Sequence, residues 1–154
     1  MNYAELLRPD LVFTDLDVEN RQDLYHLITT QLVRLDYVNV DFEEKLNRHE
    51  DESPNGISSN GMSIAIPHTY AAMESNPFIC VAICKDSVDI LQMGYNLPEP
   101  CRTFFFSNLP SSSEQLGFLQ KLMSLMQDNQ FAIELAKPND PKVVFNYLYG
   151  RLQI

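Results

Sequence analysis

Histidine is the side chain best suited to chemistry in this chain, and it occurs at three positions, His26, His49 and His68. An imidazole titrates near neutral pH, and its unprotonated nitrogen is a nucleophile. His26 falls inside a long amphipathic pattern, and we interpret it as a surface or boundary residue. His49 belongs to the charged run 48–52, where carboxylates and a helix end would favour an imidazolium, so we interpret it as solvated.

His68 follows directly on the pattern of a short strand. Residues 62–66 alternate larger apolar side chains with small or polar ones, which indicates a buried or half-buried strand. Pro67 ends this pattern because proline fixes φ and has no N–H for a sheet ladder. We therefore expect His68 at a strand exit, on a stiff backbone. Two interpretations stay open here: a partly buried histidine that caps a strand, and a presented nucleophile.

The sequence offers no metal or cofactor site. It has no His-x-x-His, Cys-x-x-Cys or His-Glu-x-x-His pattern, and its five glycines form no phosphate-binding loop. No signature supports a serine-type triad. Cys80, Cys84 and Cys101 lack metal-ligand spacing, and the first two lie in an apolar run where a buried thiol is the default. We expect no cofactor, no metal and a reducing compartment.

The length favours one domain, residues 1–154, and the absence of targeting and membrane-span patterns favours a cytoplasmic protein. A chain of 154 residues can build a single core without staples. The formal net charge is −10 and basic residues do not cluster, which argues against nucleic acid as a partner. We find no signal-peptide pattern and no membrane-span window, so we expect no membrane insertion.

Strand and helix patterns alternate along the chain. The expected strands cover residues 11–14, 62–66, 78–84, 88–91 and 102–106. The expected helices cover 20–36, 41–49 (opened by a capping-box pattern), 113–126, 129–136 and 141–150. Residues 50–60 are expected to form a loop, and 70–75 a short connection with one helical turn. This order predicts an α/β single-domain sandwich, a central mixed β-sheet flanked by helices.

The segment Ile64-Ala65-Ile66-Pro67-His68-Thr69 resembles the active-site segment of the enzyme IIA components of the bacterial sugar phosphotransferase system, mannitol–fructose superfamily. Arg48 matches an arginine that the family places upstream of its histidine. Residues 54–57, Pro-Asn-Gly-Ile, resemble the Pro-Thr-Gly-Leu segment of galactitol-type members, and 93–94 and 115–122 also sit where those members have similar residues. The resemblance runs in order from about Leu6 to Leu148.

This resemblance implies a phosphotransferase in which His68 takes a phosphoryl group from the phosphocarrier protein HPr and passes it to an enzyme IIB, in a galactitol-like or related system. It also suggests phosphate contacts from Arg48, Thr69 and Ser113. Arg48 has the alternative of a surface salt bridge with Glu44, Glu50 or Asp51, and Thr69 the alternative of capping a strand end.

Two departures from the family pattern leave the role open. His49 stands where the family usually has glutamate, and residues 111–113 are serines where many members carry a second histidine. That second histidine is thought to orient the first or help hold the phosphoryl group. The alternative to a carrier is therefore a regulatory or interaction module with the same fold, whose phosphorylation state a partner senses. A relative that has lost phosphorylation is a third possibility.

Overall fold

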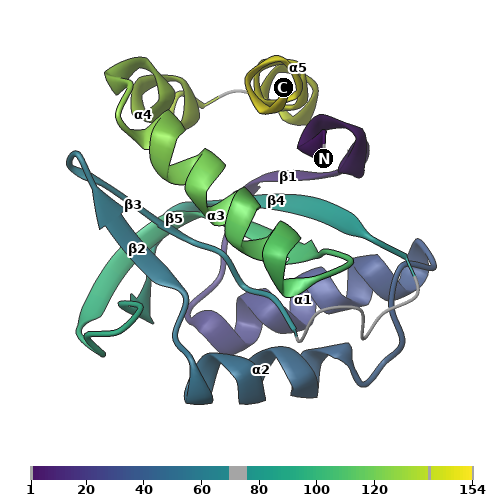
Figure 1. Cartoon of the computed structure of the whole chain (residues 1–154). Coiled ribbons are helices and arrows are strands. Elements are labelled where there is room, and N and C mark those ends of the chain that lie inside the picture. Colours follow the sequence, from purple (N-terminus) through teal and green to yellow (C-terminus); the bar gives the residue numbers. More distant parts are fainter. Residues whose placement is uncertain (1, 70–75, 139, 154) are drawn as a thin grey trace.

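A five-stranded mixed sheet lies at the centre of the protein, with helices on both faces (Figure 1). The structure is a computed structural model that describes residues 2–69, 76–138 and 140–153. The connection expected over residues 70–75 lies outside the described residues. In chain order the elements are η1 (Tyr3–Leu6), β1 (Leu7–Leu16), α1 (Arg21–Arg34), α2 (Phe42–Glu52), β2 (Gly56–Ser59), β3 (Met62–Ala65), β4 (Phe78–Leu91), β5 (Pro98–Asn108), α3 (Ser112–Met126), α4 (Asn129–Ala136) and α5 (Pro141–Leu152).

The strand order in the sheet is β1-β4-β5-β3-β2. The β1–β4 and β3–β5 pairs are parallel, whereas β4–β5 and β2–β3 are antiparallel. The predicted fold class, an α/β sandwich around a mixed sheet, is confirmed.

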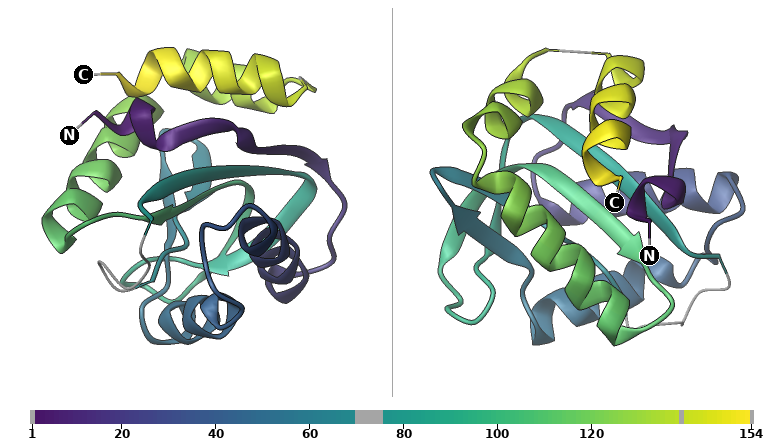
Figure 2. Two further views of the ribbon diagram at one scale, coloured as in Figure 1. Left: turned by 90° about the vertical axis from the view of Figure 1, so that its right-hand side faces the viewer. Right: turned by 45° about the horizontal axis from the view of Figure 1, so that its top comes forward.

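Each face of the sheet has its own hydrophobic core. Helices α1 and α2 cover one face, and η1, α3, α4 and α5 cover the other, where η1 lies beside α5 (Figures 1 and 2). In β4, Cys80 and Ala82 belong to the core under α1 and α2, while Ile79 and Val81 belong to the opposite core. The unbroken apolar run 78–84 thus marks a central strand covered on both sides, as predicted. All three cysteines are buried free thiols.

Side-chain caps fix three of the predicted helix starts. The side chains of Asn20, Ser111 and Asp140 each accept a hydrogen bond from the backbone N–H three residues later, at 2.9, 3.2 and 3.0 Å. The capping box predicted at 41–44 is wrong in its detail. Helix α2 does begin after Asp41, but the Asp41 side chain makes no capping hydrogen bond and lies 3.5 Å from the ammonium of Lys45 instead.

Several strand boundaries differ from the predictions, and β5, for example, covers Pro98–Asn108 where 102–106 was predicted. Part of the loop expected over 50–60 is strand β2, whose turn-type residues pair with β3 in an antiparallel hairpin. The two short strands expected at 78–84 and 88–91 are one strand, β4, which continues through an irregularity between Ile83 and Val88. Strand β1 extends beyond 11–14 on both sides because parallel pairing with β4 tolerates Pro9 at a register shift.

The sheet ends abruptly where β3 leads into Pro67. The Ile66 N–H still donates to the carbonyl of Asn55 at 3.2 Å, and the Pro67 carbonyl accepts from the Ser107 N–H at 3.0 Å. A single bridge then pairs His68 with Ser107 of β5. The backbone around His68 is therefore held on both sides, by the segment before β2 and by the end of β5.

Candidate active site

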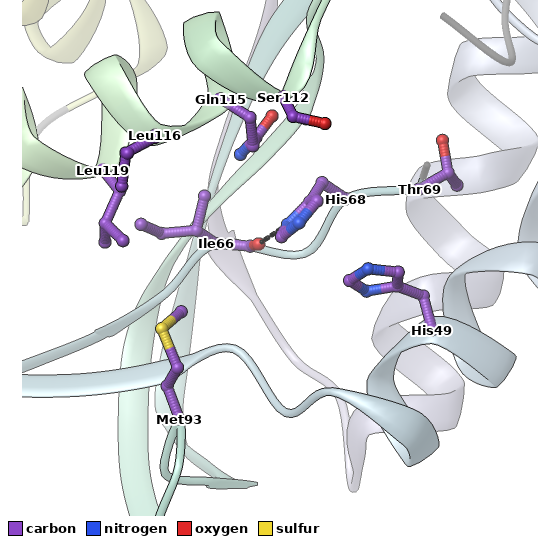
Figure 3. A pocket seen from close by; sticks show the side chains of 9 residues that line it. All are labelled: His49, Ile66, His68, Thr69, Met93, Ser112, Gln115, Leu116 and Leu119. Atoms are coloured by element: carbon purple, nitrogen blue, oxygen red, sulfur yellow. Dashed lines mark hydrogen bonds between the residues drawn. The ribbon is translucent and has the colours of Figure 1, made fainter. Parts of the chain in front are cut away.

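A pocket of about 300 Å³ opens at the end of β3, between α2 and the first two turns of α3 (Figure 3). Its lining comes from four parts of the chain that are distant in sequence: His49, Ile66, His68, Thr69, Met93, Ser112, Gln115, Leu116 and Leu119. The lining is apolar on the side of Leu116, Leu119 and Met93 and polar around the two imidazoles. Such a site combines an apolar wall with a few convergent polar groups.

His68 has one nitrogen engaged by its own backbone. Its Nδ1 lies 2.8 Å from the carbonyl oxygen of Ile66, two residues earlier (Figure 3). A carbonyl oxygen only accepts hydrogen bonds, so Nδ1 must carry the proton and donate it. The neutral ring then has its lone pair on Nε2. The backbone turn at Pro67 therefore selects the tautomer in which Nε2 is the nucleophile.

His68 is also kept unprotonated. Burial lowers the pKa of its imidazole to about 4, against a partial opposing effect of the hydrogen bond to Ile66 and a further lowering by His49. At neutral pH the ring is neutral, and the lone pair on Nε2 is available to an electrophile. Tautomer and pKa favour the same chemistry, attack by Nε2.

His49 faces His68 across the pocket. The two ring centroids are 4.5 Å apart with the planes inclined at 54° (Figure 3). His49 is only 9% exposed, so the expectation of a solvated side chain is wrong. Burial lowers the pKa of His49, while Glu50 and Glu52 raise it. The reason for the burial is helix phase: Phe42, Leu46 and His49 lie on the face of α2 that packs inward.

The neighbouring Arg48 lies outside the pocket. Its side chain is 59% exposed, and its guanidinium forms an ion pair with Glu44, one turn earlier on the same helix. Ser113 is exposed in the first turn of α3 and does not line the pocket, whereas the adjacent Ser112 does. Of the residues singled out in the sequence, the structure brings His68 and Thr69 together and leaves Arg48 and Ser113 aside.

Thr69 supplies an unused hydroxyl to the pocket. Its side chain is 4% exposed, and its Oγ1 has no hydrogen-bond partner among the described residues. A buried hydroxyl without a partner is uncommon and costs free energy unless a ligand satisfies it. The Thr69 hydroxyl is therefore available to hydrogen-bond with a polar ligand of the pocket.

The first turns of α3 add further donors. Gln115 accepts a hydrogen bond from the Ser107 hydroxyl at 3.2 Å through Oε1, so its NH₂ group remains for another acceptor. Ser112 is the first residue of α3, where unpaired backbone N–H groups carry a partial positive charge. Both residues lie above His68 in Figure 3. The pocket can therefore receive an anion next to Nε2.

A buried carboxylate network supports this end of α2. Glu50 is 2% exposed and accepts from the Tyr25 hydroxyl at 2.7 Å, the Asn55 N–H at 2.7 Å and the Asn55 side-chain amide at 3.2 Å. The Asn55 carbonyl in turn accepts from Ile66, whose own carbonyl holds His68. Helix α1, helix α2 and the His68 turn are thereby linked through hydrogen bonds.

Sequence reasoning missed His49 as a pocket residue. The available signal was the spacing of Phe42, Leu46, His49 and Glu50, at i, i+4, i+7 and i+8, which marks one helix face. Arg48 falls off that face. No group of three or more His, Cys, Asp or Glu side chains that could hold a metal ion occurs within residues 2–69, 76–138 and 140–153.

The family model described as "Phosphoenolpyruvate-dependent sugar phosphotransferase system, EIIA 2" matches residues 5–150. The chain belongs to this family. Enzyme IIA domains of the system are phosphoryl carriers. No curated protein matches the chain.

Solved structures share the fold at low sequence identity. The nitrogen regulatory protein IIA-Ntr from Neisseria meningitidis superimposes with a TM-score of 0.76 at 19% identity, covering 97% of this chain and 98% of that one. IIA mannitol from Escherichia coli gives 0.73 at 14% identity, with coverages of 92% and 97%. Enzyme IIA mannitol in complex with phosphorylated enzyme IIB mannitol, also from Escherichia coli, gives 0.75 at 15% identity, with coverages of 94% and 99%.

No helix in the described part of this enzyme IIA is both long enough and apolar enough to cross a membrane. Among the residues quoted for the family resemblance, Met93, Gln115, Leu116 and Leu119 all line the pocket. Met93 follows β4, whereas the other three lie on α3, and the fold brings the two segments together.

Proposed function

We propose that this enzyme IIA accepts a phosphoryl group from HPr on Nε2 of His68 and passes it to a cognate enzyme IIB in the cytoplasm. The observation that carries the proposal is the hydrogen bond from Nδ1 of His68 to the Ile66 carbonyl, which leaves the lone pair on Nε2 inside the pocket. In the transfer, the P–N bond of phosphorylated HPr breaks as a P–Nε2 bond forms. The donor nitrogen keeps the electron pair, and Nδ1 of His68 keeps its proton.

The pocket supports the charge that this transfer brings. Phosphoryl transfer passes through a loose transition state, so a protein acts mainly by positioning the nucleophile and stabilising the equatorial oxygens. The buried hydroxyl of Thr69, the NH₂ group of Gln115 and the N–H groups at the start of α3 are donors at the pocket. Arg48 would have to leave its ion pair with Glu44 to contribute.

The proposal also covers the class of carbohydrate that the system transports. The Pro54-Asn55-Gly56-Ile57 segment resembles galactitol-type members, and we assign the chain to a galactitol-like or related carbohydrate system on that basis. The test offers the phosphorylated protein to enzyme IIB domains of galactitol, mannitol and fructose systems in parallel. Faster transfer to the mannitol or fructose domain than to the galactitol domain would contradict the assignment.

Labelling from phosphorylated HPr tests the proposal directly. Wild-type protein is expected to take up acid-labile, base-stable label, and His68→Gln is expected to take up none. The matched control is His26→Gln, because His26 is an exposed imidazole on α1 that contacts Glu43 and does not line the pocket. Label that persists in His68→Gln would refute the assignment of His68.

A regulatory module is the second candidate. The turn of α3 that faces His68 carries Ser112 and Gln115, not the second histidine that many family members have there. A carrier passes its label to an enzyme IIB, whereas a regulator keeps it. Label retained with every enzyme IIB domain, after full uptake from HPr, would favour regulation.

A further inference from the structure

The pocket receives a phosphoryl dianion but contains no permanent cation in its described lining. Neither lysine nor arginine is among the residues that line it, and Arg48 faces away in an exposed ion pair. The described lining residues that can bear a positive charge are the two imidazoles. His68 is the acceptor, and a ring that carries the phosphoryl group cannot also serve as its counter-ion. That leaves His49, whose ring is 4.5 Å from that of His68.

We propose that His49 contacts the phosphoryl group on His68 and takes up a proton from solvent when His68 is phosphorylated. The inference rests on the proposed function of His68. It assigns to His49 a role in retaining the phosphoryl group, and it makes the stability of the phosphorylated form depend on pH. The P–N bond forms as above, and the additional event is one proton moving from water to the His49 ring.

Geometry supports the contact. A phosphoryl group on Nε2 extends from the His68 ring into the pocket that His49 also lines, and the two rings come from different walls, α2 and the strand exit (Figure 3). His49 is fixed in place because it belongs to the buried face of α2, next to Glu50. The hydrogen bonds of Glu50 to Tyr25 and Asn55 hold that end of the helix.

Opposing effects of burial and of nearby charges set the pKa of His49, so an added negative charge in the pocket can change its protonation state. Glu50 and Glu52 on its own helix stabilise the imidazolium, while burial disfavours it and lowers the pKa of the ring. His68 faces it from the strand exit, and an added positive charge on one ring disfavours one on the other.

Other elements at the pocket add no further described cation. On helix α1, Tyr25 donates a hydrogen bond to Glu50 and Arg21 forms an ion pair with Asp51. Helix α3 contributes the uncharged Ser112 and Gln115 to the pocket. A dianion within about 4–6 Å raises the pKa of a cationic group by roughly 1–3 units. At neutral pH His49 is thus neutral in the unphosphorylated protein, and it takes up a proton from solvent when His68 is phosphorylated.

The direct test follows the ring of His49 by ¹H–¹⁵N NMR in the wild-type protein, before and after phosphorylation by phosphorylated HPr or by phosphoramidate. We expect the pKa of His49 to rise by about 1–3 units on phosphorylation, while the ring signals of His26 serve as the internal reference. No rise at His49, with His68 fully phosphorylated, would refute the inference and leave the proposed function intact. A protein that accepts no phosphoryl group on His68 from either donor refutes both.

Variants give a second readout that a merely structural role would not produce. The equilibrium for phosphoryl uptake from HPr is measured between pH 5 and 8 for wild type, His49→Arg and His49→Gln. The ratio of wild type to His49→Arg cancels the titration of the donor, and we expect it to fall about 10- to 1,000-fold as pH rises, because only wild type loses its cation. His49→Gln should be weak at every pH and His26→Gln should follow wild type. Equal pH profiles for wild type and His49→Arg would refute the inference.

Discussion

Replacing His68 with glutamine should change how the stability of the protein depends on pH. The pKa of His68 is about 4 in the folded protein, chiefly because the ring is buried, compared with an ordinary value of 6.5. As pH falls below about 6.5, the unfolded chain binds a proton on this residue that the folded protein does not bind, so unfolding becomes more favourable. The stabilising contribution of the neutral ring is therefore complete above pH 6.5 and is lost as pH falls towards 4.

The size of this effect follows from the two pKa values. From 6.5 to about 4 the difference is about 2.5 pH units. At 1.36 kcal/mol per unit, the full loss is about 3 kcal/mol, and about 1.4 kcal/mol of it falls between pH 7.5 and 5.5. Glutamine keeps a polar side chain of similar reach but does not titrate, so this part of the pH dependence disappears in His68→Gln.

Urea unfolding at pH 7.5 and 5.5 measures the effect in both proteins. The other titrating groups contribute nearly equally to each, so the difference between the two losses isolates His68. We expect wild type to lose about 1.4 kcal/mol more than His68→Gln between these pH values. His26→Gln, which removes an exposed imidazole, should behave like wild type. Equal losses in wild type and His68→Gln would show that His68 has the same pKa in the folded protein as in the unfolded chain, so that burial does not keep Nε2 unprotonated.

Two further predictions concern the elements that hold the site. Tyr25→Phe removes the 2.7 Å hydrogen bond to the buried Glu50. It should lower the free energy of unfolding by about 1.5–3 kcal/mol, and no change in a urea titration would contradict the role of this network. Gly56→Ala places a Cβ 2.8 Å from the Leu91 carbonyl oxygen. It should destabilise by about 1–3 kcal/mol through displaced backbone. Gly150→Ala, with no atom within 4 Å, is the control and should unfold at the same or a higher temperature.

The fold class was predictable because local signals agreed with one another. Caps at Asn20, Ser111 and Asp140, and an apolar run long enough for a strand covered on both faces, placed most elements. Strand β2 was not predictable from its own residues. Gly56-Ile57-Ser58-Ser59 has little strand propensity, and it becomes a strand because all four residues pair with β3. In such a segment, pairing with a neighbouring strand determines the secondary structure.

The site was predictable only in part, for a geometrical reason. His68 could be singled out because Pro67 marks a strand exit, a signal carried by two adjacent residues. To predict His49 as the neighbour of His68, one has to know which face of α2 packs inward, since adjacent residues on a helix point about 100° apart. The charged run 48–52 suggested solvent on all sides, whereas the periodicity of the buried positions separates His49 from Arg48.

The acceptor that orients His68 belongs to the main chain, and this has an evolutionary consequence. A side-chain acceptor can be deleted by a single nucleotide change, but the carbonyl of residue 66 is present whichever amino acid is encoded there. The orientation of the His68 ring thus depends more on the conformation of the backbone at residues 66–68 than on which side chains surround it. Mutational drift around the turn can then be extensive as long as the proline bend persists, so the reactive nitrogen is protected against substitutions that would disable a side-chain-held histidine.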